Sequence, residues 1–442
     1  MVQLKAMNND DMIEKLKIIF KTYWPLAVSW LFMAVDTPAI TAFVSRMHDP
    51  KNVLAAHGTA YPQILLIEAP VVMLTSASLT LCIDGKNYRR VHRLMLILCA
   101  LVTFLHALIC VPPVFELIFV KILDVPQELL AYCHDELFWV IPWSGLIGYR
   151  RFNQGVLIRC GKSEKVTIGT AIRMISMFGS LGLFLLFRDH FSGACAAGVS
   201  MSVCVALESL YNGIEGSRVA KQQMAALESD EPLISWKDLV AFIIPLILTT
   251  YMNNIWMSVG SGAVSRMVNP VISLAVWPVI SSMLNLLKCW GSAINETALA
   301  KLSVPGMRRP LELFTLYVTG FTFILCLLFA LPPRNDFWYV TVSSLRPELV
   351  SVSKLAFPFV ILSPVLSPVM YFYQAILTLG KRTRSIFESL IVFLIVIFAV
   401  FGVGILSGRW MGIYPVVVGM SLATAGQVLW LRFRVHQMEN RN

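Results

Sequence analysis

Charged residues are scarce in this chain. Only 14% of its 442 residues are Asp, Glu, Lys or Arg, whereas 57% are hydrophobic. A soluble globular chain has about 25% charged and about 45–50% apolar residues, so this shortage excludes an ordinary soluble protein. The composition instead predicts a polytopic membrane protein.

Motifs for enzymatic chemistry and metal binding are also missing from the sequence. It contains no P-loop, no nucleotide-binding glycine fingerprint, no H-E-x-x-H and no G-x-S-x-G. Its nine cysteines show no C-x-x-C spacing, and most lie in apolar runs, where cysteine behaves as a small hydrophobe. We therefore expect that the protein binds no metal and no cofactor and is not an enzyme. The sequence leaves open whether a proton or a sodium ion serves as a coupling ion.

Long apolar runs dominate the chain. About 20 apolar residues are needed to cross a bilayer. Twelve candidate spans meet this need, roughly at 18–44, 53–82, 94–120, 129–149, 166–187, 192–214, 239–264, 270–298, 311–332, 347–378, 386–407 and 411–431. With the N-terminus inside, 25 Lys and Arg belong to inside segments and 9 to outside loops, when Lys21 and Lys354, in the first turns of their spans, are counted with the segments that precede them. The positive-inside rule therefore places both termini in the cytoplasm.

This topology accounts for the basic character of the chain. The net charge of +10 could suggest nucleic-acid binding, but most of the basic residues lie in the inside segments. We therefore expect no nucleic-acid partner. The expected partners are the lipid bilayer and a small-molecule or lipid substrate, for a monomeric, multi-pass protein of the plasma (cytoplasmic or inner) membrane.

The two halves of the chain repeat at a fixed offset of 220 residues. The sequence V-S-R-M at 44–47 recurs at 264–267, and Pro50 falls on Pro270. A constant offset over a long stretch indicates an internal repeat. The predicted domains are a six-helix bundle plus linker at 1–220 and a second six-helix bundle at 221–442.

The number of spans in each half fixes the kind of repeat. Six is even, so both halves enter the membrane in the same direction, and parallel repeats place the substrate site where the halves meet. The predicted fold is thus an all-α membrane protein with twelve transmembrane helices, in two parallel repeats around a central polar cavity. The segment at about 215–238 is a polar linker, and Ser235 to Asp238 is predicted to cap the seventh helix.

A polar stripe runs along the eighth span. Its members lie at steps of four, three, four and three, which places them on one side of an α-helix: Ser281, Asn285, Lys288, Ser292 and Asn295. Lys288 is about ten residues from the end of the span, so it lies roughly 15 Å deep, near the bilayer midplane. A charge there costs at least ~2.5–3.5 kcal/mol and usually faces a bundle interior or a wet cavity. We therefore expect this stripe to line the cavity.

A second polar stripe is predicted on the second span. His57, Tyr61 and Glu68 share helical spacing, and the repeat offset places Glu68 opposite Lys288. The hypothesis is that Glu68 and Lys288 approach each other as a gate or a charge-compensating pair. The alternative is that each is satisfied within its own half by backbone or hydroxyl groups.

Polar groups of the first and seventh spans are further candidates for the pathway. Asp36 lies two residues before Pro38, where a carboxylate suits proton coupling, because dry surroundings favour its neutral form. A structural hydrogen bond to the kink at Pro38 is the alternative. Asn253 and Asn254 lie in the equivalent seventh span and either contact a solute or hold helices together.

Three more charged residues lie within the spans. Arg173, in the fifth span, either attracts anions or snorkels to the cytoplasmic surface. Glu208 and Glu296 are near the cytoplasmic ends of their helices, and we expect them to be half-solvated.

Short stretches resemble a known group of transporters. Polar first and second helices that recur as the seventh and eighth resemble the MATE and polysaccharide-flippase superfamily. Residues 54–61, LAAHGTAY, resemble an L-A-x-x-G-x-A-Y run of the progressive ankylosis protein family, which also has an aspartate at the position of Asp36. Residues 242–246 and 264–266 resemble its second half. The resemblance implies a V-shaped, alternating-access exporter; animal relatives are associated with release of pyrophosphate, nucleotides and citrate.

The leading interpretation is therefore a secondary transporter or flippase. A lysine in the cavity favours export of an anionic organic solute or an anionic lipid-linked headgroup. A proton- or sodium-coupled antiporter of drugs or organic cations, using Asp36 and Glu68, is the alternative, and a major-facilitator fold also has parallel halves. A membrane-embedded lipid-modifying enzyme would need a clustered site. The only such cluster, residues 134–136, is interpreted as a solvated helix start.

Overall fold

The chain is helical throughout the part that the structure describes. The computed structural model describes residues 9–224, 233–302, 304–380 and 382–440, and these ranges contain helices and no strand. Eleven helices in them are long and apolar enough to cross a membrane. The remaining predicted span lies within α7 (Gln127–Arg159), a helix of 33 residues. The predicted all-α membrane fold is confirmed.

Contacts between helices divide the chain into two units. Unit 1 comprises residues 1–41 and 276–442, and unit 2 comprises residues 42–275. The boundaries fall inside α2 (Asp36–Val44) and α11 (Pro270–Lys301). As a result, the first span belongs with helices of the second half, and the seventh span belongs with helices of the first half. The units therefore cut across the predicted halves at the first helix of each.

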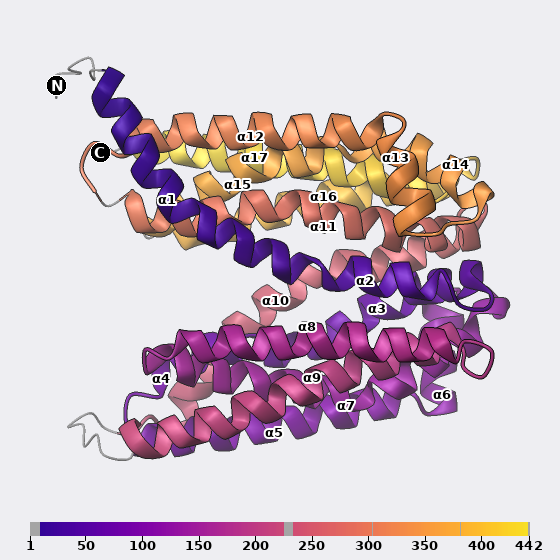
Figure 1. The fold of residues 1–442 in the computed structure, drawn as a ribbon, viewed down its shortest axis with the longest axis horizontal. Coiled ribbons are helices and arrows are strands. Elements are labelled where there is room, and N and C mark those ends of the chain that lie inside the picture. Colours follow the sequence, from indigo (N-terminus) through magenta and orange to yellow (C-terminus); the bar gives the residue numbers. More distant parts are fainter. Residues whose placement is uncertain (1–8, 225–232, 303, 381, 441–442) are drawn as a thin grey trace. The chain divides into compact units, whose positions relative to one another are not determined.

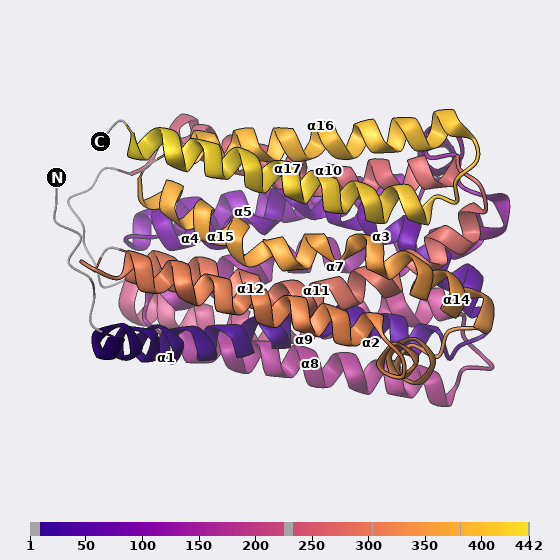
Figure 2. The same cartoon turned by 90° about the horizontal axis from the view of Figure 1, so that it is seen from above.

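Unit 1 contains the first helix and the helices of the second half. Besides parts of α2 and α11, its elements are α1 (Asn9–Ala34), α12 (Arg308–Ala330), α13 (Arg334–Asp336), η3 (Phe337–Val342), α14 (Pro347–Ala356), η4 (Phe357–Val360), α15 (Leu362–Leu379), α16 (Thr383–Ser407) and α17 (Ile413–Glu439). Helices α16 and α17 pack side by side along their lengths (Figure 2).

Unit 2 contains the remaining helices. Its elements, besides the other parts of α2 and α11, are α3 (Pro50–Val72), α4 (Leu74–Leu81), α5 (Gly85–Ile109), α6 (Pro112–Phe115), η1 (Glu116–Ile122), α7, α8 (Ser163–Leu186), α9 (Gly193–Val219), η2 (Ala220–Met224) and α10 (Trp236–Ser265). Helix α7 packs against α3, α5 and α9, and α8 runs beside α9 (Figure 1).

Prolines mark breaks in two of the spans. Helix α1 ends at Ala34 and α2 begins at Asp36, because Pro38 has no N–H to donate to the carbonyl of Ala34. Helix α3 ends at Val72, two residues after Pro70. The first two predicted spans are therefore each built from two consecutive helices.

Helix starts recur at the predicted offset. Helices α3 and α11 begin at Pro50 and Pro270, α8 and α16 at Ser163 and Thr383, and α9 and α17 at Gly193 and Ile413. Each pair is 220 residues apart. The repeat seen in a few sequence matches is thus present in the backbone across most of both halves.

The linker is shorter than the sequence analysis predicts. Helix α9 and η2 continue to Met224, and α10 begins at Trp236. Residues 225–232 of the predicted linker lie outside the described residues. The cap of the seventh helix is confirmed, because the Asp238 backbone N–H donates to Ser235 Oγ at 3.1 Å.

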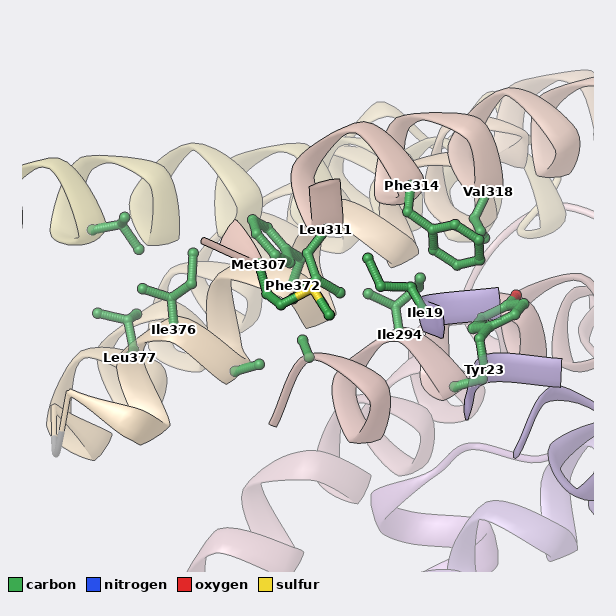
Figure 3. Packing of buried hydrophobic residues seen from close by; sticks show 14 of the residues in the cluster. Ile19, Tyr23, Ile294, Met307, Leu311, Phe314, Val318, Phe372, Ile376 and Leu377 are labelled. Carbon is green, nitrogen blue, oxygen red and sulfur yellow. The ribbon is translucent and has the colours of Figure 1, made fainter. Parts of the chain in front are cut away.

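The core of unit 1 joins α1 to helices of the second half. Tyr23 of α1 packs edge-on against Phe314 of α12, with ring centroids 5.1 Å apart, and its hydroxyl donates to the Trp290 carbonyl at 3.0 Å. Ile19, one turn earlier, is fully buried. Figure 3 shows these side chains with Ile294 in one apolar cluster. This cluster explains why α1 belongs to unit 1.

Candidate functional site

Lys288 lies in the middle of α11 and is partly buried. Its ammonium makes no hydrogen bond or ion pair with the residues of unit 1 that the structure describes. The hydroxyls of the same stripe do not serve it, because Ser281 donates to the Pro278 carbonyl and Ser292 donates to the carbonyl of Lys288. A membrane-embedded charge without a partner in its own unit is costly and is typical of a functional position.

The other stripe residues of α11 differ in exposure. Asn285 is exposed, whereas Asn295 donates through Nδ2 to the Tyr371 carbonyl at 3.1 Å and so joins α11 to α15. Glu296 is exposed and accepts a hydrogen bond of 3.1 Å from Trp30 Nε1 of α1. Asp36 is half-buried in the first turn of α2, also within unit 1.

The α3 stripe in unit 2 contains a buried histidine–carboxylate pair. His57 Nδ1 lies 2.7 Å from Glu136 Oε1, and the two side chains are 2% and 0% exposed. The ring of Tyr61 stacks on His57, with centroids 5.2 Å apart. The interpretation of residues 134–136 as a solvated helix start is therefore wrong. Helix α7 begins at Gln127, which places Glu136 in its third turn and turns it into the bundle.

Glu68 is buried about two turns beyond Tyr61 on the same helix. It is 6% exposed, and its Oε2 has no hydrogen-bond partner among the described residues. Helix α7 comes close here, because a Cβ on Gly148 would lie 2.9 Å from Val71 Cβ. Arg151 is one turn beyond Gly148, and a helical side chain points back towards the helix N-terminus. Glu68 accordingly interacts electrostatically with Arg151 and its neighbour Arg150.

A buried ion network connects α7, α8 and α9. Glu208 of α9 is 0% exposed and accepts from Arg150 Nη1 at 2.6 Å through Oε2, which also lies 3.2 Å from Arg173 Nε of α8. Its Oε1 accepts from Gln154 Nε2 at 3.1 Å. A buried charge must be paired and hydrogen-bonded to be tolerated, and this carboxylate is.

This network corrects three expectations. Glu208 is fully buried rather than half-solvated. Arg173 does not snorkel, since its guanidinium binds that carboxylate instead. Arg150 and Arg151 belong to a helix that runs to Arg159, although the sequence analysis counted them in an inside loop. The split of basic residues still favours the same orientation after these two are removed.

Polar contacts also join α10 to α3 within unit 2. Asn254 Nδ2 donates to the Leu65 carbonyl at 3.1 Å, which fits its predicted alternative role of holding helices together. Asn253 is exposed. Gln63, which the sequence analysis did not single out, accepts from Ser258 and donates to Ser261 at 3.2 Å. These bonds explain why the seventh span belongs to unit 2.

The predicted site residues thus fall into separate groups. Unit 2 brings His57 and Tyr61 to Glu136, and Glu68 to the α7 arginines. Unit 1 contains Asp36, Asn285, Lys288 and Glu296. Sequence reasoning missed Arg150, Arg151 and Gln63 and set Glu136 aside as solvated. A charged residue within the predicted span 129–149 was a signal available for Glu136, whereas Arg150 and Arg151 lie just beyond that span. Among the described residues, no group of three or more His, Cys, Asp or Glu could hold a metal ion.

Solved structures with a similar fold are transporters. An inward-facing multidrug-resistance MATE family transporter of the MOP superfamily matches with a TM-score of 0.69 at 14% identity, over 94% of this chain and 98% of that chain. An outward-facing one matches at 0.62, with 16% identity over 98% and 99%. A MOP superfamily transporter from Pyrococcus furiosus matches at 0.63, with 15% identity over 98% and 99%.

Sequence comparison adds no closer relative. No family model matches the chain, and no curated protein does. The predicted finer likeness to the progressive ankylosis family therefore stays a prediction. The predicted superfamily fold is confirmed by the structural matches, and the chain has the fold of the MATE family transporters of the MOP superfamily.

Proposed function

We propose that this chain is a secondary transporter that works by alternating access and carries an anionic organic solute or an anionic lipid-linked headgroup. The observation that carries the proposal is Lys288, a cation in the middle of a membrane helix with no counter-charge among the described residues of unit 1. Keeping such a charge in a membrane is costly, and a bound anion would offset that cost. The same residue would repel a cationic drug.

The fold supports transport but not the choice of substrate. Function is decided by the site rather than by the fold. For the Pyrococcus furiosus transporter, reverse polarity of the binding pocket suggests a different function. The polarity of this chain's own residues therefore has to be argued directly. In unit 2, the three arginines Arg150, Arg151 and Arg173 outnumber the two buried carboxylates with which they interact, Glu68 and Glu208, which also favours an anion.

The remaining features of the proposal come from the sequence. The two six-helix halves, 1–220 and 221–442, are proposed to act as the parallel repeats of a monomeric carrier. Both termini are proposed to lie in the cytoplasm, with the protein in the plasma (cytoplasmic or inner) membrane. A proton or sodium gradient is the proposed driving force, with Asp36, Asn253, Asn285 and Glu296 as further pathway residues.

Transport by the purified full chain in liposomes tests the proposal. Radiolabelled citrate serves as the anion and tetraphenylphosphonium as the cation, under imposed proton or sodium gradients. We expect citrate uptake by wild type and a loss of about ten-fold or more in Lys288→Met, since a charge-assisted bond contributes about 1.5–3 kcal/mol. Lys288→Arg should retain most activity. Lys301→Met, which removes the lysine at the end of the same helix, is the matched control.

The other interpretations predict different results in the same experiment. Gradient-driven movement of tetraphenylphosphonium that survives in Lys288→Met would replace the proposal with an organic-cation antiporter. Chemical conversion of a lipid by the protein in detergent, where no compartments exist, would identify an enzyme. Equal citrate uptake by wild type and Lys288→Met would remove the lysine from the pathway.

A further inference from the structure

One face of α5 carries a row of basic side chains at its N-terminal end. Lys86, Arg89 and Arg93 are exposed, at steps of three and four, so they lie on the same side of the helix. None of the three makes a hydrogen bond or an ion pair with any residue that the structure describes. We call this row the α5 basic stripe.

The neighbouring Arg90 differs from the three stripe residues, because it has partners within the chain. Arg90 is turned to the other side, where its guanidinium lies 5.0 Å from the centroid of the Trp236 ring and donates to the Ile234 carbonyl at 3.2 Å. It therefore fastens the start of α10 to α5. The α5 basic stripe makes no such contact with the part of the chain that the structure describes.

The same face continues without interruption as an apolar surface. Leu96, Ile97, Leu101 and Phe104 extend the stripe at helical spacing and are 49%, 57%, 46% and 64% exposed. The opposite face is buried, with Val91, Met95 and Val102 at 0%. In a membrane helix, a large exposed apolar face contacts lipid chains. The α5 basic stripe therefore lies on the lipid-facing side of the helix.

The depth of the stripe matches the headgroup region. From Leu94 to the end of α5 at Ile109 there are 16 residues, or roughly 24 Å of helix, which occupies most of a hydrocarbon core of about 30 Å. The eight residues from Lys86 to Arg93 then lie at the level of the headgroups. Basic residues directly beside a membrane helix attract anionic lipids.

The second half of the chain offers an internal comparison. Helix α12 occupies the corresponding place in the repeat and begins with Arg308 and Arg309. There Arg308 is neutralised by Glu312, at 3.2 Å, and by Glu439. In α5 no acidic side chain among the described residues takes up the charge of the stripe. Arg309 is exposed and makes no ion pair with a described residue, but it stands alone. Among the described residues, the row of three unpaired basic side chains therefore occurs in α5 and not in α12, and topology alone does not require it.

We propose that the α5 basic stripe, with the apolar surface that continues it, is a binding site for one anionic phospholipid. The headgroup phosphate lies against Lys86, Arg89 and Arg93, and an acyl chain lies along Leu96, Ile97, Leu101 and Phe104. This lipid is distinct from the transported solute, and the site does not depend on the proposed substrate. Charge complementarity and the continuous apolar track select a lipid over a soluble anion.

Lipid enrichment in nanodiscs tests the site. The purified full chain is placed in discs of phosphatidylglycerol and phosphatidylcholine at about one to four, as a mixed bilayer with a moderate anionic charge. The relative association constant for phosphatidylglycerol is measured by mass spectrometry of the lipid retained on the protein. Each basic residue near an anionic surface raises the association constant about five-fold. In the variant K86Q/R89Q/R93Q, the relative association constant for phosphatidylglycerol should therefore fall at least five-fold.

Two matched variants separate a site from general charge and from misfolding. K21Q/R309Q/R432Q removes the same charge from three exposed residues on α1, α12 and α17 and should keep the enrichment. R89K/R93K keeps the charge and should also keep the enrichment of phosphatidylglycerol. That result would show that α5 tolerates substitution at these positions. An equal loss in both triple variants would show a diffuse charge effect and overturn the proposal.

A soluble headgroup completes the test. Glycerol 3-phosphate added to phosphatidylcholine discs should leave the thermal midpoint of wild type unchanged, whereas phosphatidylglycerol should raise it. If glycerol 3-phosphate raises the midpoint as much as the lipid does, the stripe binds a soluble anion and the lipid site is wrong. Wild type without any enrichment of phosphatidylglycerol would likewise contradict it.

Discussion

Asp49 and Asn269 adopt the same left-handed backbone conformation, 220 residues apart. Their φ angles are 48° and 50°, and each directly precedes the proline that begins a membrane helix, Pro50 or Pro270. Among non-glycine residues, Asp and Asn enter this region most readily. Two residues of different charge therefore adopt the same backbone conformation at equivalent positions. The repeat is present in the backbone even where the side chains differ.

Substitutions at Asn269 should follow backbone conformation rather than side-chain chemistry. Asn269→Gly should leave the free energy of unfolding nearly unchanged, because glycine adopts a positive φ without strain. Asn269→Val should cost about 1–2 kcal/mol, because a β-branched side chain clashes there. Thermal unfolding of the purified protein measures both. Equal midpoints for the two variants would contradict a role for the left-handed conformation.

Glycines that allow close helix contact should not tolerate a methyl group. A Cβ on Gly155 of α7 would lie 2.0 Å from Ser78 Oγ and 2.4 Å from the Thr75 carbonyl oxygen, so Gly155→Ala should destabilise the protein by about 1–3 kcal/mol or more. Gly179 of α8 has nothing within 4 Å of such a Cβ, and Gly179→Ala should stabilise it by up to about 1 kcal/mol. Unfolding in increasing denaturing detergent ranks the two. The reverse order would contradict the packing described for α7.

Removing the shared carboxylate of the ion network should be severe. Glu208→Gln keeps the shape of the side chain but leaves the guanidinium groups of Arg150 and Arg173 without its charge, which we expect to cost about 3–5 kcal/mol. The matched control is Glu312→Gln, whose partner Arg308 is 3.2 Å away at an exposed position, and its cost should not exceed about 1 kcal/mol. Thermal midpoints report both. Similar small losses would show that the network contributes little.

Exchange of two charges tests whether Glu68 and Lys288 compensate each other. Glu68→Lys and Lys288→Glu should each reduce transport strongly, because each leaves two like charges in the membrane. The double variant should recover a substantial part of the rate if the hypothesis from the repeat is right. Solute uptake into liposomes, normalised to the amount of protein inserted, provides the measurement. A double variant no better than either single one would favour separate roles for the two residues.

Some features of this protein could be predicted from local sequence. The predicted spans, the 220-residue offset and the cap at Ser235 all appear in the structure, because apolar length, turn residues and caps are properties of neighbouring residues. The position of Lys288 in the middle of α11 follows from the same kind of information. Helix ends are predicted less well. The fourth span is predicted to end at residue 149, where the apolar run ends, although the helix continues to Arg159.

The partners of the polar residues could not be predicted in this way. His57 binds Glu136, which is 79 residues away, and Arg150 binds Glu208, which is 58 residues away. The spacing of residues along one helix shows which side of that helix a side chain occupies, but it does not show which other helix packs against that side. For that reason the sequence predicts a half-solvated Glu208 and a solvated Glu136, although both are buried.

The sequence by itself determined that this chain is a helical membrane protein, where its spans lie and that its halves are related, since hydropathy and backbone preferences act over a few turns of chain. Only the tertiary structure decided that α1 belongs with the helices of the second half and α10 with those of the first. It also decided which buried charges neutralise one another. These outcomes depend on side chains packing across helices that are distant in sequence, and no local pattern records them.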